Sequence, residues 1–184
     1  MKLKAIIFSF IFLCFGLSKI VCASEALNKI PLPYDYEVEW KCINTTIPQK
    51  TCDQFSYYVL DGIKDGLHET LLRVAKALKL GPFPEDTSYA FLGDLGSTRV
   101  LVAQDFSDNV ATYAVFTLIN DRLVDHRVIG VGDMEAGSVT RDFVIDKSYR
   151  VFVYSRKPNS GIKSPRKLVG KYQIQPDGKI AVLN

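Results

Sequence analysis

From residue 89 to the C-terminus, the chain consists of short runs of branched and aromatic residues separated by turn signals. The eight runs are 89–92, 99–105, 111–119, 123–130, 139–145, 149–155, 171–175 and 179–183. The connections include Asn120-Asp121, Asp146-Lys147-Ser148 and Pro176-Asp177-Gly178, which are residue types that favour tight turns. Tight turns join antiparallel neighbours, so this region is predicted to be an antiparallel β-meander.

In the segment before the meander, the apolar residues follow a different spacing from that of the strands. Its apolar residues recur at steps of three and four, which predicts one amphipathic helix: Leu60, Ile63, Leu67, Leu71, Val74 and Leu78. Thr51 and Gln54 resemble a capping box that would start this helix at Cys52, and Gly81 followed by Pro82 would end it. Gly62 and Gly66 favour a bend or a break, so the pattern is clearest over residues 65–80.

Residues 34–42, YDYEVEWKC, alternate between apolar and charged side chains. Period-two alternation is typical of a half-buried strand, here with an acidic outer face. Together with the helix and the meander, this predicts a single α+β domain. It would contain about 7–9 antiparallel strands, with one main α-helix within residues 52–80 packed on the sheet.

The first 23 residues have the features of a secretory signal peptide. Lys2 and Lys4 precede an apolar run over residues 5–17, and Val21-Cys22-Ala23 offers a cleavage site after Ala23. The run is shorter than the roughly 20 residues that span a membrane, so we expect no stable membrane insertion after cleavage. Residues 24–184 would then form the exported domain, which is periplasmic or secreted.

Cleavage would leave Cys42 and Cys52 as the two remaining cysteines. Their spacing is not the C-x-x-C of thiol–disulfide exchange, and with no other thiol and no histidine nearby in the sequence, they do not indicate a metal site. An exported compartment favours a disulfide. Closing this loop should stabilise the fold by about 2.7 kcal/mol on the chain-entropy estimate.

Basic residues are concentrated near the C-terminus. Without the three lysines of the signal segment, acidic and basic side chains balance, yet residues 147–179 carry nine basic residues and one acidic residue. The loop from Arg156 to Lys171 is predicted to be irregular, and we expect it to be the binding surface. Its candidate binding residues are Arg156, Lys157, Lys163, Arg166, Lys167 and Lys171. The alternative is a hairpin tip that only increases solubility.

Catalytic motifs are weak. His68-Glu69 begins the zinc motif H-E-x-x-H, but Leu72 stands where the second histidine is required. Asp125-His126 could be an acid–base pair, although no nucleophile accompanies it. We therefore predict no catalytic residues, no metal and no cofactor. The basic loop lacks the aromatic residues on which single-stranded nucleic acid stacks, so nucleic acid is not an expected partner.

These observations favour a non-enzymatic exported protein-binding module. Its partner would be a protein with an acidic surface, met through a sheet edge or the basic loop. An inhibitor or immunity-type role, neutralising a toxin or a cell-wall hydrolase, would suit such a protein. The alternatives are a small envelope hydrolase that uses His126 with Asp125 or His68 with Glu69, and an accessory component of an envelope or secretion complex.

Overall fold

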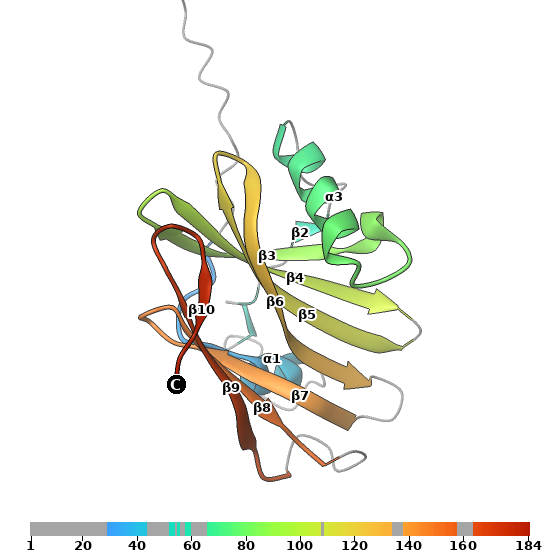
Figure 1. Ribbon diagram of the computed structural model, residues 1–184. Coiled ribbons are helices and arrows are strands. Elements are labelled where there is room, and N and C mark those ends of the chain that lie inside the picture. Colours follow the sequence, from blue (N-terminus) through green and yellow to red (C-terminus); the bar gives the residue numbers. More distant parts are fainter. Residues whose placement is uncertain are drawn as a thin grey trace, which may run out of the picture.

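A computed structural model of the chain describes residues 29–43, 52–53, 55, 58–59, 66–107, 109–133, 138–157 and 164–184. In this part of the chain, strands form one antiparallel sheet, with helices beside it (Figure 1). The helices are α1 (Tyr36–Ile43), α3 (Gly66–Leu78) and the 3-10 helix η2 (Pro84–Asp86). The strands are β1 (Tyr34–Asp35), β2 (Tyr58–Val59), β3 (Ser88–Leu95), β4 (Thr98–Ser107), β5 (Val110–Ile119), β6 (Arg122–Asp133), β7 (Ser138–Ile145), β8 (Arg150–Ser155), β9 (Lys167–Ile174) and β10 (Ile180–Val182).

The strand order confirms the predicted meander. Strands β2 to β10 lie side by side in sequence order, and β1 pairs separately with β7. Each of the eight predicted runs corresponds to one strand from β3 to β10. The turn between β5 and β6 has Asn120 and Asp121 at φ 49° and 57°, the left-handed conformation that tight hairpins require and that asparagine and aspartate tolerate. The α+β class is therefore confirmed.

The central strands are buried on both faces. Along β4, Leu101 and Ala103 pack in one core, while Val100 and Val102 pack in the other, because successive strand residues point to opposite faces. Helix α3 covers the first core (Figure 1) through a stripe of buried side chains: Leu71, Val74, Ala75 and Leu78. This stripe confirms the helix predicted over residues 65–80.

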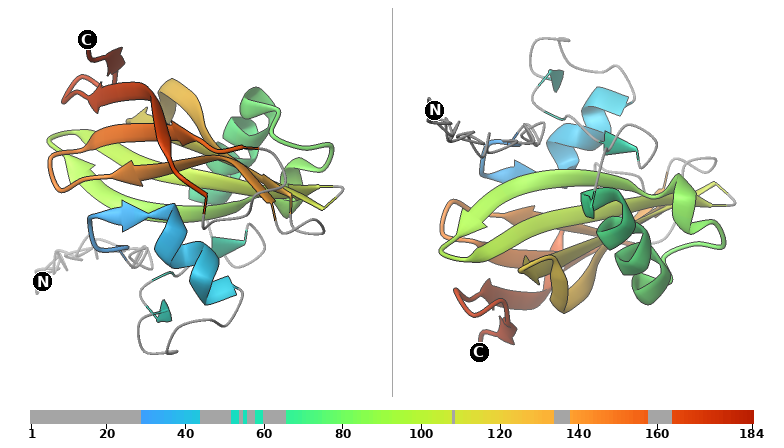
Figure 2. Two further views of the ribbon diagram at one scale, coloured as in Figure 1. Left: turned by 90° about the horizontal axis from the view of Figure 1, so that it is seen from below. Right: turned by 90° about the horizontal axis from the view of Figure 1, so that it is seen from above.

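The second core is closed by the β9–β10 hairpin and by the N-terminal segment. At the hairpin tip, Thr117 Oγ1 donates to the carbonyl of Gly178 at 2.6 Å. Nearby, the backbone N–H of Ile180 donates to Asp125 Oδ2 at 2.9 Å. Figure 2 shows α1 and this hairpin on opposite sides of the molecule, and both contribute buried side chains to the second core.

The strand predicted over residues 34–42 is wrong beyond Asp35, because residues 36–43 form helix α1. Asp35 caps this helix by accepting a hydrogen bond from the Glu37 N–H at 2.8 Å. Lys41 bonds Glu37 one turn earlier at 2.9 Å, and the rings of Tyr36 and Trp40 stack 5.8 Å apart. Tyr36 and Trp40 are four residues apart, so they would lie on the same face of a helix and also on the same face of a strand. The cap and the i,i+4 ion pair favour the helix.

The helix predicted within residues 52–65 is wrong at two of the residues that the structure describes. Tyr58–Val59 forms strand β2, paired with β3, so the helical assignment of these two residues is wrong. Aromatic and β-branched residues favour strands, and the existing edge of β3 provides a partner. The capping pair Thr51 and Gln54 lies outside the described residues.

Candidate interaction surface at the edge of strand β9

The six basic residues predicted to bind a partner occupy three kinds of environment. Arg156 is buried and Arg166 is partly buried, whereas Lys157 and Lys167 are exposed and Lys171 is half-buried; Lys163 lies outside the described residues. The irregular loop predicted through Lys171 is wrong after Arg166, because β9 begins at Lys167. Leu168 and Val169 continue the strand pattern towards Tyr172, and the sheet edge of β8 is available to pair with them.

Arg156 forms the centre of a buried ionic cluster. Its side chain is 1% exposed and donates through Nε to Asp142 Oδ2, a carboxylate that is 0% exposed. One terminal nitrogen donates to Glu37 Oε2 at 3.1 Å, and the other donates to the carbonyl of Ser164. The contacts therefore tie α1, β7 and the segment before β9 to a single guanidinium.

Arg166 extends the same cluster towards the surface. One of its terminal nitrogens lies 3.0 Å from Asp35 Oδ1 and 3.1 Å from Glu37 Oε2. Its Nε lies 3.2 Å from Asp142 Oδ1, an ion-pair distance, although the N–H is not aimed well enough for a hydrogen bond. We refer to Asp35, Glu37, Asp142, Arg156 and Arg166 as the Arg156 cluster.

The titration of these groups follows from burial and pairing. Burial alone would raise the pKa of Glu37, but the hydrogen bond from Lys41 and the charges of Arg166 and Arg156 lower it overall. Burial raises the pKa of Asp142, and the bond from Arg156 offsets only part of that effect. Burial disfavours the charge of Arg166, yet the bond to Asp35 and the nearby carboxylates raise its pKa overall.

Both arginines therefore already have acidic partners within the chain. A binding role for Arg156 would require a partner to reach a side chain that is 1% exposed. The acidic residues that neutralise these arginines come from positions 35, 37 and 142, far from the basic loop in sequence. Of the predicted binding residues that the structure describes, Lys157, Lys167 and Lys171 remain as candidates for an external partner.

Strand β9 presents a partly open edge beside these lysines. Its residues 167–173 pair with β8, but β10 reaches only Tyr172 to Ile174, and the Leu183 N–H adds a bond to the Lys171 carbonyl at 2.8 Å. Among the described residues, none forms a backbone hydrogen bond to residues 167–170 on the side away from β8. We call this segment, Lys167 to Gly170, the β9 edge.

The β9 edge is apolar at its centre and basic at its ends. Leu168 and Val169 are 50% and 53% exposed, and Lys167 and Lys171 flank them. A bulge leaves Val169 without a direct cross-strand partner, because Leu168 is opposite Tyr154 and Gly170 is opposite Val153. The sequence does not reveal this surface, since its exposure depends on where β10 ends.

A partly exposed aromatic residue extends the surface across the sheet. Tyr154 lies opposite Leu168 on the same face, and the Arg166 guanidinium lies 5.2 Å from the centre of its ring. An arginine over an aromatic face forms a cation–π contact. This contact holds Tyr154 in place beside the β9 edge and leaves a mixed apolar and basic surface.

The two candidate acid–base pairs are not brought together. His126 is opposite Phe116 and Asp125 is opposite Thr117 on β5, so the two side chains point to opposite faces of β6. The carboxylate oxygens of Asp125 accept hydrogen bonds from the backbone N–H groups of His126 and Ile180. His68 and Glu69 are consecutive helical residues, which do not face each other.

Other features of the described residues bear on the kind of site present. Cys42, in the last turn of α1, lies at disulfide-bonding distance from Cys52, with their Cα atoms 5.4 Å apart. Within the described ranges, no group of three or more His, Cys, Asp or Glu residues could hold a metal ion. None of the helices described is long and apolar enough to cross a membrane.

A comparison of the chain with protein-family models, with curated proteins and with solved structures found no match. What the β9 edge can bind therefore follows from its geometry alone. Its exposed apolar residues, its flanking lysines and the backbone groups that no described residue bonds can contact an extended chain.

Proposed function

We propose that the protein is a non-enzymatic exported binding module that captures an acidic protein partner along the β9 edge. The partner would add an extended segment beside residues 167–170, a mode in which backbone hydrogen bonds supply affinity. The single observation that carries this proposal is the side of residues 167–170 away from β8, which no described strand pairs, with Leu168 and Val169 about half exposed.

The charge of the surface supports an acidic partner. Lys167 is exposed at the edge, Lys171 follows it, and Lys157 is exposed two residues after the end of β8. The acidic side chains of the Arg156 cluster pair with its two arginines. Complementary charge increases the association rate and disfavours wrong partners, and apolar contacts with Leu168 and Val169 would limit dissociation.

An inhibitor or immunity-type role agrees best with this surface. Such a protein needs complementarity to its target and no chemistry of its own. A target that enters the same exported compartment, such as a toxin or a cell-wall hydrolase, would satisfy this requirement. The disulfide-distance pair Cys42 and Cys52 is compatible with that compartment.

The decisive experiment changes the β9 edge without disturbing the Arg156 cluster. The wild-type protein, Lys167→Glu/Lys171→Glu and Leu168→Ser would be immobilised, and an envelope extract would be passed over each. A protein retained by the wild type should be lost from both variants, and its retention should weaken as salt increases. Arg166→Glu is unsuitable, because it would break ion pairs to Asp35 and Glu37.

Matched controls separate this surface from general charge and hydrophobicity. Lys147→Glu changes an exposed lysine in the β7–β8 turn, and Phe83→Ser removes a side chain that is 58% exposed near η2. Both controls should retain the partner. Equal retention by the edge variants and by the controls would contradict the proposal.

A further inference from the structure

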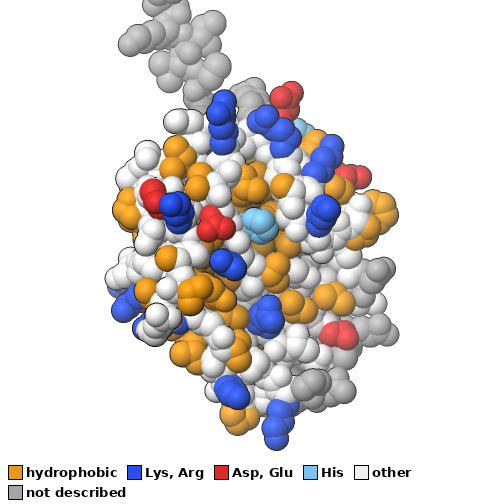
Figure 3. Space-filling model, in the orientation of Figure 1, with side chains coloured by type: hydrophobic (Ala, Val, Ile, Leu, Met, Phe, Trp, Pro, Cys, Tyr) orange, Lys and Arg blue, Asp and Glu red, His pale blue; other side chains and the backbone are white. Residues whose placement is uncertain are grey.

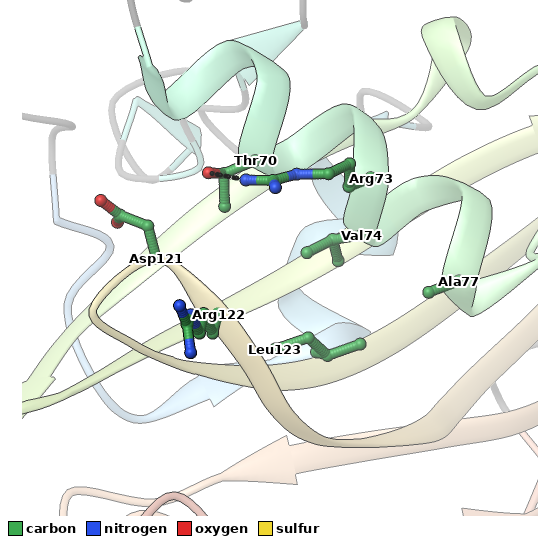
Figure 4. A pocket seen from close by; sticks show the side chains of 7 residues that line it. All are labelled: Thr70, Arg73, Val74, Ala77, Asp121, Arg122 and Leu123. Carbon is green, nitrogen blue, oxygen red and sulfur yellow. Dashed lines mark hydrogen bonds between the residues drawn. The ribbon is translucent and has the colours of Figure 1, made fainter.

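A groove separate from the β9 edge lies between helix α3 and the start of strand β6. Its volume is about 280 Å³, just below the roughly 300–1,000 Å³ of small-molecule sites. Figure 4 shows its lining residues, which come from α3 and from the β5–β6 turn region: Thr70, Arg73, Val74, Ala77, Asp121, Arg122 and Leu123.

The groove has an apolar floor. Val74 is 3% exposed and Leu123 packs partly buried against the core beneath α3. Figure 4 shows both side chains between the helix and the strand, with Ala77 further along the helix. Apolar walls of this kind favour a ligand with a short hydrocarbon part.

Two arginines stand at the polar end of this floor. Arg73 lies on α3, and Arg122 lies at the start of β6 on the other side of the groove (Figure 4). Neither forms an ion pair with any residue that the structure describes, and Arg73 donates to the neutral Thr70 Oγ1 at 3.1 Å. Figure 3 shows the face of the molecule seen in Figure 1, where Lys and Arg side chains are scattered among hydrophobic and other side chains.

Both arginines are exposed and start from regular elements of the fold. Arg73 is one turn along α3 from the buried Thr70. Arg122 begins β6 directly after the tight turn at Asn120 and Asp121. The fold therefore sets the backbone positions of both arginines at the groove.

Nearby charges indicate the charge of the ligand. Asp121 Oδ1 lies 3.7 Å from Arg99, and Asp94 lies 3.8 Å from the same arginine. Of the lining residues, Arg73 and Arg122 are basic and Asp121 is acidic, which leaves one positive charge in excess. A single negative charge would balance it, whereas a doubly charged phosphate ester would not. Guanidinium groups also match the planar geometry of carboxylates.

We propose that this groove binds a small amphipathic monocarboxylate, with its carboxylate between Arg73 and Arg122 and its hydrocarbon part on Val74 and Leu123. The site goes beyond capture of a protein at the β9 edge and does not depend on it. A ligand of this size should bind weakly, with a dissociation constant on the order of 1 mM.

The experiment titrates the purified oxidised protein with hexanoate and follows backbone amide shifts by nuclear magnetic resonance. Saturable shifts should concentrate at residues 70–77 and 121–123. Hexanol, which lacks the charge, and acetate, which lacks the chain, should bind at least about tenfold more weakly. Arg73→Gln and Arg122→Gln should each raise the dissociation constant about tenfold.

Arg127→Gln provides the matched control, because Arg127 lies over the Tyr172 ring away from the groove. It should bind hexanoate as the wild type does. Non-saturable shifts, equal binding of hexanol, or unchanged affinity in both groove variants would overturn the proposal. If the groove instead takes an acidic side chain of a large partner protein and no free carboxylate, hexanoate would give no saturable shifts, and the proposal would also fail.

Discussion

Arg156 and Asp142 form an ion pair in which both side chains are almost completely buried, at 1% and 0% exposure. Arg156 begins the loop predicted to bind a partner, yet its guanidinium points inwards to β7 and α1. The pair makes Arg156 a structural residue, because it gives a charged partner to a carboxylate that water does not reach.

Replacing one member of this pair should strongly destabilise the protein. In Arg156→Met the Asp142 carboxylate loses its closest partner and remains buried, so the free energy of unfolding should fall by about 3–5 kcal/mol. Urea unfolding of the oxidised protein measures this loss. The neighbouring Lys157→Ala, at an exposed position, should change stability by less than about 0.5 kcal/mol. A loss for Arg156→Met no larger than that of the control would contradict a structural role.

The pKa of Glu37 predicts a specific pH dependence. Lys41, Arg166 and Arg156 hold this pKa below its ordinary value of 4.5, so the folded state favours the carboxylate more than the unfolded state does. The resulting stabilisation is complete above pH 4.5 and decreases as the pH falls below it. Glu37→Gln removes it at all pH values.

The stability difference between the wild type and Glu37→Gln should therefore be largest near neutral pH and should shrink in acid. Denaturant unfolding at a series of pH values measures this difference. The other acids of the Arg156 cluster are present in both proteins, so most of their titration cancels. A difference that stays constant or grows below pH 4.5 would show that Glu37 does not have a lowered pKa.

Loss of the bond between Cys42 and Cys52 should lower the free energy of unfolding without abolishing binding of the partner. Their sequence separation is 10 residues, and a loop of this length corresponds to about 2.7 kcal/mol in the chain-entropy model. The double variant Cys42→Ser/Cys52→Ser should unfold at lower urea concentration and still retain the partner. A thiol assay that finds Cys42 and Cys52 both free in the folded protein would rule out the bond.

The histidines provide a test between a binding module and an enzyme. The structure places the ring of His126 and the carboxylate of Asp125 on opposite faces of β6, and His68 and Glu69 do not face each other on α3. His68→Gln/His126→Gln should therefore retain the partner as the wild type does. Loss of the biological effect in this variant, with the fold shown intact by circular dichroism, would favour a hydrolase.

The order of the strands followed from local sequence patterns, but two other features could not be predicted in that way. Tyr36 and Trp40 fit both a strand and a helix, and the cap from Asp35 is one of the local contacts that favour the helix. The partners of Arg156 lie 14 and 119 residues away. Such distant pairs depend on how β7 and α1 are packed, which no local pattern records.

The sequence by itself determined the antiparallel meander and the amphipathic stripe of α3, because side-chain periodicity and turn residues act over a few neighbouring positions. Only the tertiary structure decided which cations remain available to a partner. Pairing brings Asp142 and Glu37 to Arg156, and the early end of β10 leaves Leu168 and Val169 exposed. Burial and edge exposure arise from contacts between distant segments, so they appear only when the whole chain is folded.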